Sequence, residues 1–343
     1  MSPRRGATLQ QVAEEAGVHR STASRALNPA TAGLISPDVV ARVQSIAGRL
    51  GYRRDILAAS MRTNRTRLVG VLVPDLANPV FAPILAGTQS ALAEHGYSVL
   101  VANAKPGNSD EIIALVDGFI ARRAEGLILA TACGDDPLLL YCLEARLPTV
   151  LVNRADLHNR FSAATPDDRE GIRLAVRHLV SLGHRRIAHL AGPQNVSTGR
   201  LRREGFLEEM RSAGLPPGPV ITAESYTREA GFVAATQLLN MTTEITAVAA
   251  ANDLLALGIY QALAERGLSC PNDVSITGHN DMMLVDMVRP ALTTVRILNE
   301  RIGSEGARLL LERMARPDVP VTLVQTMPKL IIRDSTAPMR NVD

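Results

Sequence analysis

Six side chains that can form hydrogen bonds lie close together in the stretch TLQQVAEEAGVHRSTASRALN, which covers residues 8–28. They are His19, Arg20, Ser21, Thr22, Ser24 and Arg25. No carboxylate interrupts the group. Donors that carry positive charge are what DNA phosphates and base edges require. The stretch therefore predicts contact with nucleic acid.

Two short helices must position these side chains. The first has an apolar face at helical spacing, formed by Leu9, Val12, Ala13 and Ala16. Gly17 ends it, because glycine enters a left-handed turn without steric cost. A second helix follows from about Arg20 to Leu27, and three apolar residues can pack back on the first: Val18, Ala23 and Leu27. The spacing alone also fits an ordinary helical pair that presents polar side chains to water.

A further helix closes this small N-terminal unit. Ser36 is its expected N-cap, Pro37 lies in its first turn, and Asp38 faces the positive end of the helix dipole. Its apolar face consists of Val39, Val40, Val43, Ile46, Ala47 and Leu50. Gly51 ends the helix.

Length, composition and charge predict a basic head on a larger body. The 343 residues exceed one typical domain. Aromatic residues make up only 3% and Trp is absent, so the core must be aliphatic, which suits parallel sheets covered by helices. Residues 1–65 carry a net charge of +6 and the whole chain carries +3, which leaves −3 for the remainder. This asymmetry favours nucleic acid over membrane as the partner.

The cysteines and the N-terminus indicate a reducing compartment. Cys133, Cys142 and Cys270 lie in apolar segments without CxxC spacing, which favours buried thiols over disulfides or a metal site. The N-terminus has no apolar signal region, and no run approaches the ~18 apolar residues of a membrane helix. We expect a soluble cytoplasmic protein associated with the nucleoid, with no cofactor and no membrane partner.

Beyond Arg67, short apolar strands alternate with helical stretches, which predicts parallel doubly wound sheets. Two series suggest two lobes. The first series of strands is 68–74, 97–103, 126–130 and 149–153, and the second is 186–192, 219–224, 245–253 and 273–281. We expect the chain to cross between lobes near residues 163–166, 292–295 and 324–326. Ligands of such sheets bind beyond the carboxyl ends of the strands.

The head resembles that of the lac-repressor (LacI/GalR) family, whose signature T-L-x-x-V-A-x-x-A-G-V-x-x-x-T-x-S-R-x-L-N it matches almost position by position. The resemblance implies a small all-α helix-turn-helix head at 1–52, a hinge helix and linker at 53–66, and an effector-binding core at 67–343. That core has two lobes of the periplasmic-binding-protein type, an N-lobe at about 67–164 and 293–325 and a C-lobe at about 165–292 and 326–343.

The family binds double-stranded operator DNA as a homodimer, and we expect the same here. We assign Arg25, Arg20 and Ser21 to base edges and Thr22, Ser24 and Thr8 to phosphates. The other expected DNA-binding residues are His19, Asn28, Tyr52, Ala58 and Met61. Met61 stands where the family places a leucine wedge in the minor groove. The chain departs from the family at the start of the hinge, where Arg54 and Asp55 replace the usual proline and Asn or Ser.

The resemblance also implies a small-molecule effector between the lobes. Positions that match its cleft are Asp75, Asn78, Phe81, Asn153, Arg154, Arg202, Asn252, Asp253 and Asn280. An arginine can clamp a carboxylate or two hydroxyls, and Asn and Asp can fix the remaining hydroxyls. Each polar residue, taken singly, is also a common cap or turn former.

The cleft departs from the family pattern in its charges. Asn153 and Asn280 stand where the family often has Asp, and Ile297 replaces a common Gln. Neutral amides beside arginine accommodate a carboxylate without like-charge repulsion. The effector is therefore either an anionic metabolite such as a sugar acid, a less hydroxylated ligand than a neutral hexose, or a neutral sugar held through amides.

Other classes of protein fit the sequence less well. No GxGxxG, GxSxG, GxxxxGK or HExxH motif occurs, so we do not expect an enzyme. A solute-binding protein for transport would have no use for the basic head. A regulator controlled by a partner protein stays open. The chain stops soon after Asp334 without a heptad tail, which favours a dimer. Effector identity, the sign of its effect and the operator sequence stay undetermined.

Overall fold

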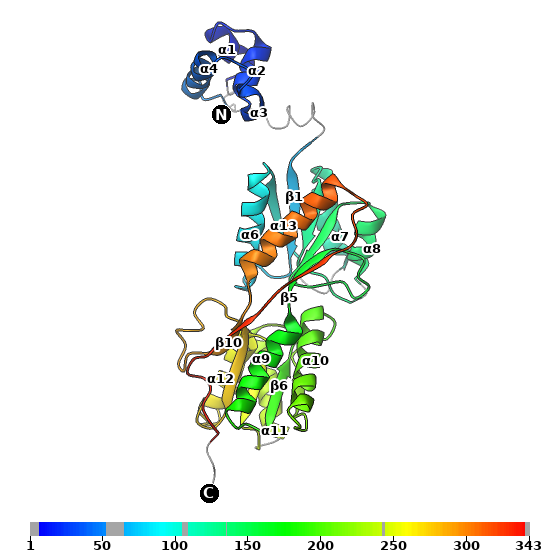
Figure 1. Cartoon of the computed structure of the whole chain (residues 1–343), viewed down its shortest axis with the longest axis vertical. Helices are drawn as coiled ribbons and strands as arrows, with labels where there is room; N and C mark the ends of the chain where they lie inside the picture. Colours follow the sequence, from blue (N-terminus) through cyan, green and yellow to red (C-terminus); the bar gives the residue numbers. More distant parts are fainter. Residues whose placement is uncertain (1–6, 53–64, 105–108, 135, 242–243, 340–343) are drawn as a thin grey trace. The chain divides into compact units, whose positions relative to one another are not determined.

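Two compact units, Met1–Thr66 and Arg67–Asp343, make up the chain. The structure, a computed structural model, describes residues 7–52, 65–104, 109–134, 136–241 and 244–339 (Figure 1). No helix among these residues is long and apolar enough to cross a membrane. Cys133, Cys142 and Cys270 are free thiols.

The first unit is a bundle of short helices. They are α1 (Leu9–Glu15), α2 (Arg20–Ala26), α3 (Pro29–Ala32) and α4 (Pro37–Arg49). Thr8 begins α1 in a capping box, in which its hydroxyl accepts from the backbone N–H of Gln11 and the Gln11 side chain accepts from the N–H of Thr8. Gly17 has a φ of +62° and turns the chain into α2. The short α3 was not expected from the sequence.

Small aliphatic side chains fill the centre of this unit, which explains how so few residues form a core. The buried members are Val12, Ala13, Ala16, Ala23, Ala26, Val43, Ile46 and Ala47. Leu9, Val18 and Leu27 pack against them from the edge. A bond of 2.5 Å between Arg49 and Glu15 joins α4 to α1.

The second unit begins with a parallel sheet in the strand order β11-β5-β4-β3-β1-β2. Its strands are β1 (Leu68–Val73), β2 (Ser98–Asn103), β3 (Gly126–Leu129), β4 (Thr149–Val152), β5 (Ala163–Pro166) and β11 (Leu323–Thr326). Its helices are α6 (Phe81–Glu94), α7 (Ser109–Ala121), α8 (Pro137–Glu144) and α13 (Asn299–Ala315). We call this sheet with its helices the first lobe.

Alternation along β1 shows how helices cover both faces of this sheet. Val69, Val71 and Val73 pack with the apolar residues of α6 and α13. Leu72, between them, packs with α7 and α8 on the other face. The helices α6 and α13 approach closely through glycine, because a Cβ on Gly303 would lie 2.0 Å from the carbonyl oxygen of Ile84.

The second lobe repeats this construction with the strand order β12-β10-β9-β8-β6-β7. Its strands are β6 (Ile187–Ala191), β7 (Val220–Thr222), β8 (Ala247–Ala250), β9 (Ser275–Asn280), β10 (Thr293–Arg296) and β12 (Lys329–Ile331). Only β12 runs antiparallel to its neighbour in the described part of this sheet. The helices are α9 (Asp168–Ser181), α10 (Ser197–Ser212), α11 (Arg228–Met241) and α12 (Asp253–Ala264). The helices α9 and α10 pack on one face, and α11 and α12 on the other (Figure 1).

The chain passes from one sheet to the other after β5, after β10 and between β11 and β12. The predicted fold class, a helix-turn-helix head with two doubly wound lobes, is confirmed. One lobe boundary differs from the sequence prediction. The sequence predicts that the chain returns to the first lobe at residue 293. The strand β10 pairs with β9 and β12, so Thr293–Arg296 belongs to the second lobe and the return follows it. A strand of four residues fits either sheet, and only its pairing decides between them.

Candidate functional site

The exposed face of α2 carries two arginines whose side chains are available for contacts outside the head. Arg20 and Arg25 are both exposed, and within the described residues no hydrogen bond or ion pair engages either side chain. Ser21 is exposed next to Arg20, while Thr22 and Ser24 are half-buried. Because α2 is held by its apolar side, these donors point away from the core of the head.

The remaining head residues have local roles that can be read directly. His19 is the N-cap of α2, where its Nδ1 accepts from the backbone N–H of Ser21 at 3.3 Å and lies 2.8 Å from the Ser21 hydroxyl. Asn28 is the N-cap of α3, and Tyr52 packs against the head core. Thr8 uses its hydroxyl in the cap of α1. The predicted hinge contacts Ala58 and Met61 lie outside the described residues.

In the second unit, a buried arginine lies where several strands of the second lobe end. Arg202 on α10 is 3% exposed. Its Nε donates to Asp168 Oδ1 at 2.8 Å, and its Nη2 lies 2.7 Å from the same oxygen. Its Nη1 donates to the carbonyl of Ala251 at 2.6 Å, and Nη2 also reaches Asn280 Oδ1 at 3.4 Å. Every nitrogen of this guanidinium therefore has a partner within the fold.

Burial affects the pKa of the carboxyl that faces Arg202. Desolvation raises the pKa of Asp168, while the positive charge and hydrogen bond of Arg202 act in the opposite direction. The pair is fully enclosed, so removal of either partner would leave an uncompensated group in a low-dielectric environment. Arg202 and Asp168 thus hold α9 and α10 together at the edge of the sheet.

The two asparagines predicted for the cleft share an unusual backbone conformation. Asn153 has a φ of +64° and Asn280 a φ of +115°, a region that asparagine enters more easily than most residues. Both are buried, and Asn280 Oδ1 also lies 3.2 Å from Nδ1 of His279. This backbone conformation explains the presence of asparagine at both positions just as well as a role in ligand binding does.

Asn252 and Asp253 follow β8 and have structural partners. Asn252 caps α12 by accepting from the N–H of Leu255 at 2.8 Å. Asp253 is fully buried, and its carboxylate accepts from the Thr294 hydroxyl at 2.5 Å and from the N–H of Met282 at 2.8 Å. Burial raises the pKa of Asp253 to about 7.

The three residues predicted after β1 do not gather with Arg202 in any contact among the described residues. Asp75 is exposed and accepts from the N–H of Ala77, and Asn78 accepts from the N–H of Val80. Both form local turns of the kind that Asx residues favour. Phe81 is 3% exposed and belongs to the core of the first lobe.

Arg154 differs from Arg202 in having almost no partners. It follows β4, and its one described hydrogen bond runs from Nη1 to the carbonyl of Thr131 at 3.5 Å. Its Nε is shielded from solvent and unpartnered, as is the hydroxyl of Thr131. Burial lowers the pKa of Arg154, and Tyr226 and Asp168 on the second lobe act on it electrostatically.

The loops around Arg154 bring the two lobes into contact. The N–H of Ala155 donates to the Ser197 hydroxyl at 3.0 Å, and the N–H of Gly134 donates to the carbonyl of Asn195 at 2.7 Å. The first of these bonds joins the segment after β4 to the start of α10, and the second joins the segment after β3 to the loop after β6. Arg154 therefore lies at the junction of the lobes, where ligands of such folds bind.

An open groove of about 790 Å³ is lined by α6 and the start of α13 of the first lobe and by the ends of β9 and β10 of the second lobe. Asn280 is the one predicted effector residue in its lining. No group of three or more His, Cys, Asp or Glu side chains among the described residues could hold a metal ion.

Sequence reasoning missed three residues of the junction. Asp168 stands next to Asp167, which caps α9 by accepting from the N–H of Glu170 at 3.0 Å, and it was not predicted as a site residue. Tyr226, whose hydroxyl donates to Thr198 at 3.2 Å, and Thr131 had no motif around them. An acidic pair directly after a strand at a lobe crossing was the available signal for Asp168.

Comparison with known proteins agrees with this arrangement. Residues 8–55 match the description "Bacterial regulatory proteins, lacI family", and residues 176–336 match "Periplasmic binding protein-like domain". The ribose operon repressor of Escherichia coli strain K12 is 30% identical over 332 residues, which cover 96% of this chain and 99% of that protein.

Two solved structures are similar over almost the whole chain. The lac repressor dimer bound to operator and the anti-inducer ONPF is 27% identical, with a TM-score of 0.85 and coverage of 97% of this chain and 100% of that one. The complex of the transcriptional regulator CelR with cellobiose is 30% identical, with a TM-score of 0.74 and coverage of 96% and 99%. With its head, its two lobes and these relatives, the chain belongs to the lacI family of bacterial regulatory proteins.

Proposed function

We propose that this chain is a cytoplasmic transcriptional repressor that binds a pseudo-palindromic operator as a homodimer and responds to a small carbohydrate-like effector at the lobe junction. The exposed face of α2, with Arg20 and Arg25 free of partners in the described head, carries the proposal. The similar lac repressor structure is a dimer on operator DNA, and the similar CelR structure contains cellobiose. Protein and operator would share a two-fold axis.

We assign roles within each half-site by reach and chemistry. Arg25, Arg20 and Ser21 read base edges, while Thr22, Ser24 and Thr8 contact phosphates. His19, Asn28 and Tyr52 complete the head contacts, and Ala58 and Met61 act in the hinge. The cleft serves binding rather than catalysis, because the relatives above are named as repressors and regulators. Binding at the junction would change the closure of the lobes and thereby the geometry of the dimer.

The test compares specific with nonspecific DNA. An operator is first obtained by selection from a random duplex pool with the full chain. Arg25→Ala should weaken binding to that operator by about 1–3 kcal/mol, because a bidentate contact to guanine is lost. The same substitution should weaken binding to scrambled DNA much less. Fluorescence anisotropy at fixed salt gives both affinities.

Arg42→Ala is the matched control, since Arg42 is an exposed arginine on α4 rather than α2. It removes the same charge, so its effect measures the general electrostatic term. An equal loss on operator and scrambled DNA for Arg25→Ala would contradict the base-reading role.

A further inference from the structure

Two arginines at the junction of the lobes differ in how many of their guanidinium nitrogens have a hydrogen-bond partner. This difference bears on the chemical class of the ligand. Arg202 has all of its nitrogens bonded to Asp168, Ala251 and Asn280. It is a positioning residue that has little left to offer a ligand. Arg154 keeps an unpartnered Nε and makes one long bond to a backbone carbonyl.

Within the described residues no carboxylate forms an ion pair with Arg154, and three carboxylates of the second lobe have other partners. Asp168 binds Arg202, and Asp253 binds Thr294 and Met282. Asp281 bridges Arg296 at 2.6 Å and Arg333 at 2.8 Å.

Asp136 is likewise occupied, because it accepts from the N–H of Leu138 as the cap of α8. A polyhydroxylated neutral ligand needs acceptors for its hydroxyl protons, and carboxylates are the strongest ones. These four carboxylates have prior partners within the fold. What the junction offers instead is donors.

The position of Arg154 favours a bound anion over a purely structural role. The residue keeps part of its surface exposed, although its Nε is shielded. The hydroxyl of Thr131 is buried and unpartnered beside it. Both groups lack an acceptor, and the charge-assisted bonds that a carboxylate or phosphate oxygen accepts from a guanidinium are among the strongest in proteins.

We propose that the effector carries an anionic group, a carboxylate or a phosphate, that binds Arg154 with support from the Thr131 hydroxyl. The inference rests on the proposed function, because it assigns the chemical class of the same effector. The amides of Asn153 and Asn280 then orient the neutral part of the ligand.

The experiment uses matched ligands. Glucose, galactose and ribose, each with its aldonate and its terminal phosphate, are titrated calorimetrically into the full chain at one pH and ionic strength. At least one anionic member should bind, and its neutral parent should bind at least ten-fold more weakly. The aldonate and phosphate arms distinguish the two sources of negative charge.

Variants then locate the contact. Arg154→Gln should weaken binding of the anionic ligand by about 10- to 100-fold, as expected for loss of a hydrogen bond to a charged group. Its effect on the neutral parent should stay below about three-fold. Arg154→Lys should retain part of the affinity because it keeps the charge, and Thr131→Val should cause a smaller loss.

Arg211→Gln is the control, because Arg211 is exposed at the end of α10. Its affinities should equal those of the unmodified chain, and thermal unfolding checks that each variant is folded. Preference for a neutral sugar, or an equal loss for acid and parent in Arg154→Gln, overturns this inference and leaves the proposed function standing. Failure of every compound, neutral and anionic, counts against the proposed function itself.

Discussion

Arg202 and Arg154 at the junction of the lobes show how hydrogen-bond partners determine what a buried arginine can do. Arg202 is 3% exposed and bonded through all of its nitrogens, so its cost of burial is offset inside the fold. Arg154 lacks such compensation, and burial lowers its pKa. In the sequence both are arginines near a strand end. Only the hydrogen bonds separate the fully bonded guanidinium of Arg202 from that of Arg154, which keeps an unpartnered nitrogen.

Asp253 gives a pH prediction at the same scale. Its pKa rises from 3.8 in the unfolded chain to about 7 in the fold. The folded state therefore holds a proton that the unfolded state has released, and stability falls as pH rises from about 4 to about 7. Asp253→Asn should remove this loss, which amounts to at most about 4 kcal/mol at 1.4 kcal/mol per pKa unit.

Calorimetric melting temperatures of the full chain between pH 5 and pH 8 provide the measurement. The unmodified chain should lose stability relative to Asp253→Asn as pH increases. Asp318→Asn, at an exposed turn after α13, is the control and should give the same difference at every pH. If the unmodified chain instead gains stability relative to Asp253→Asn as pH increases, the fold stabilises the Asp253 carboxylate rather than penalising it.

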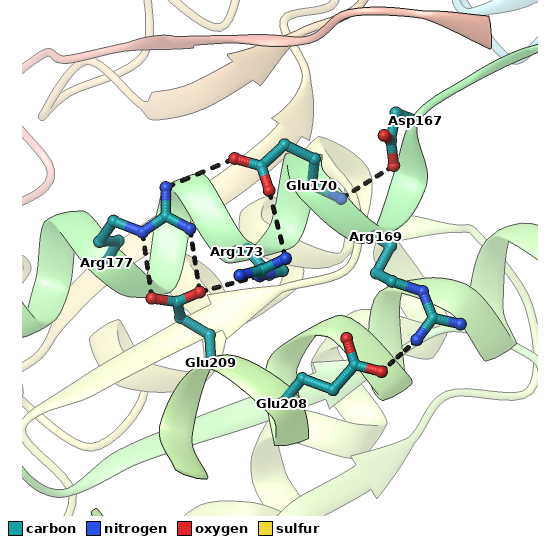
Figure 2. Close-up of polar contacts among 7 residues, drawn as sticks. All are labelled: Asp167, Arg169, Glu170, Arg173, Arg177, Glu208 and Glu209. Carbon is teal, nitrogen blue, oxygen red and sulfur yellow. Dashed lines mark hydrogen bonds and ion pairs between the residues drawn. The ribbon is translucent and has the colours of Figure 1, made fainter. Parts of the chain in front are cut away.

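At the scale of elements, the pair α9 and α10 is joined by charged side chains across its outer face. Figure 2 shows Glu209 of α10 between Arg173 and Arg177 of α9, with Glu170 on their other side. Glu209 accepts from Arg177 Nε and Nη2 at 3.0 Å each and from Arg173 Nε at 2.9 Å. This network fixes the helices that carry Asp168 and Arg202.

We predict that Glu209→Gln lowers the free energy of unfolding by about 1–2 kcal/mol, because a half-shielded network loses its central charge. The hydrogen bonds from Arg177 and Arg173 lower the pKa of Glu209. The contribution is therefore fully present above the unfolded pKa of 4.5 and is lost as pH falls below it. Urea unfolding at pH 7 and in raised salt measures the effect.

Glu208→Gln serves as the control for this network. Glu208 is the neighbouring acid on α10. Among the described residues it pairs only with Arg169 (Figure 2), and its side chain is 38% exposed. Its loss should cost no more than about 0.5 kcal/mol. Equal effects of the two substitutions would mean that the network around Glu209 is no stronger than an isolated surface pair.

At the scale of the whole molecule, function depends on coupling the head to the junction. The chain passes between the lobes at three places, which lets the lobes move about a common hinge while each sheet stays intact. If two heads act together on one operator, the second half-site is bound at high effective concentration. In the proposed function, effector binding would act by changing the dimer geometry.

This coupling can be tested with DNA of one or two half-sites. A duplex with both half-sites should bind the full chain at least 100-fold more tightly than a duplex with one half-site scrambled. Sedimentation should show two protomers on the longer site. Equal affinity for both duplexes, or one protomer per duplex, would contradict the homodimer.

The sequence by itself determined the head, the fold class and the approximate positions of β1–β4 and β6–β9, because helical spacing, Gly17 and runs such as Leu68–Val73 are local signals. It marked 163–166, 292–295 and 324–326 only as crossings between lobes, and it did not predict β12. It also placed Arg202 and Arg154 near strand ends. The tertiary structure decided what these residues do. The pairing of β10 with β9, the bond between Arg202 and Asp168 and the unpartnered Nε of Arg154 depend on segments far apart in the chain. No local pattern encodes which buried charges meet, since that is settled only when sheets and helices pack.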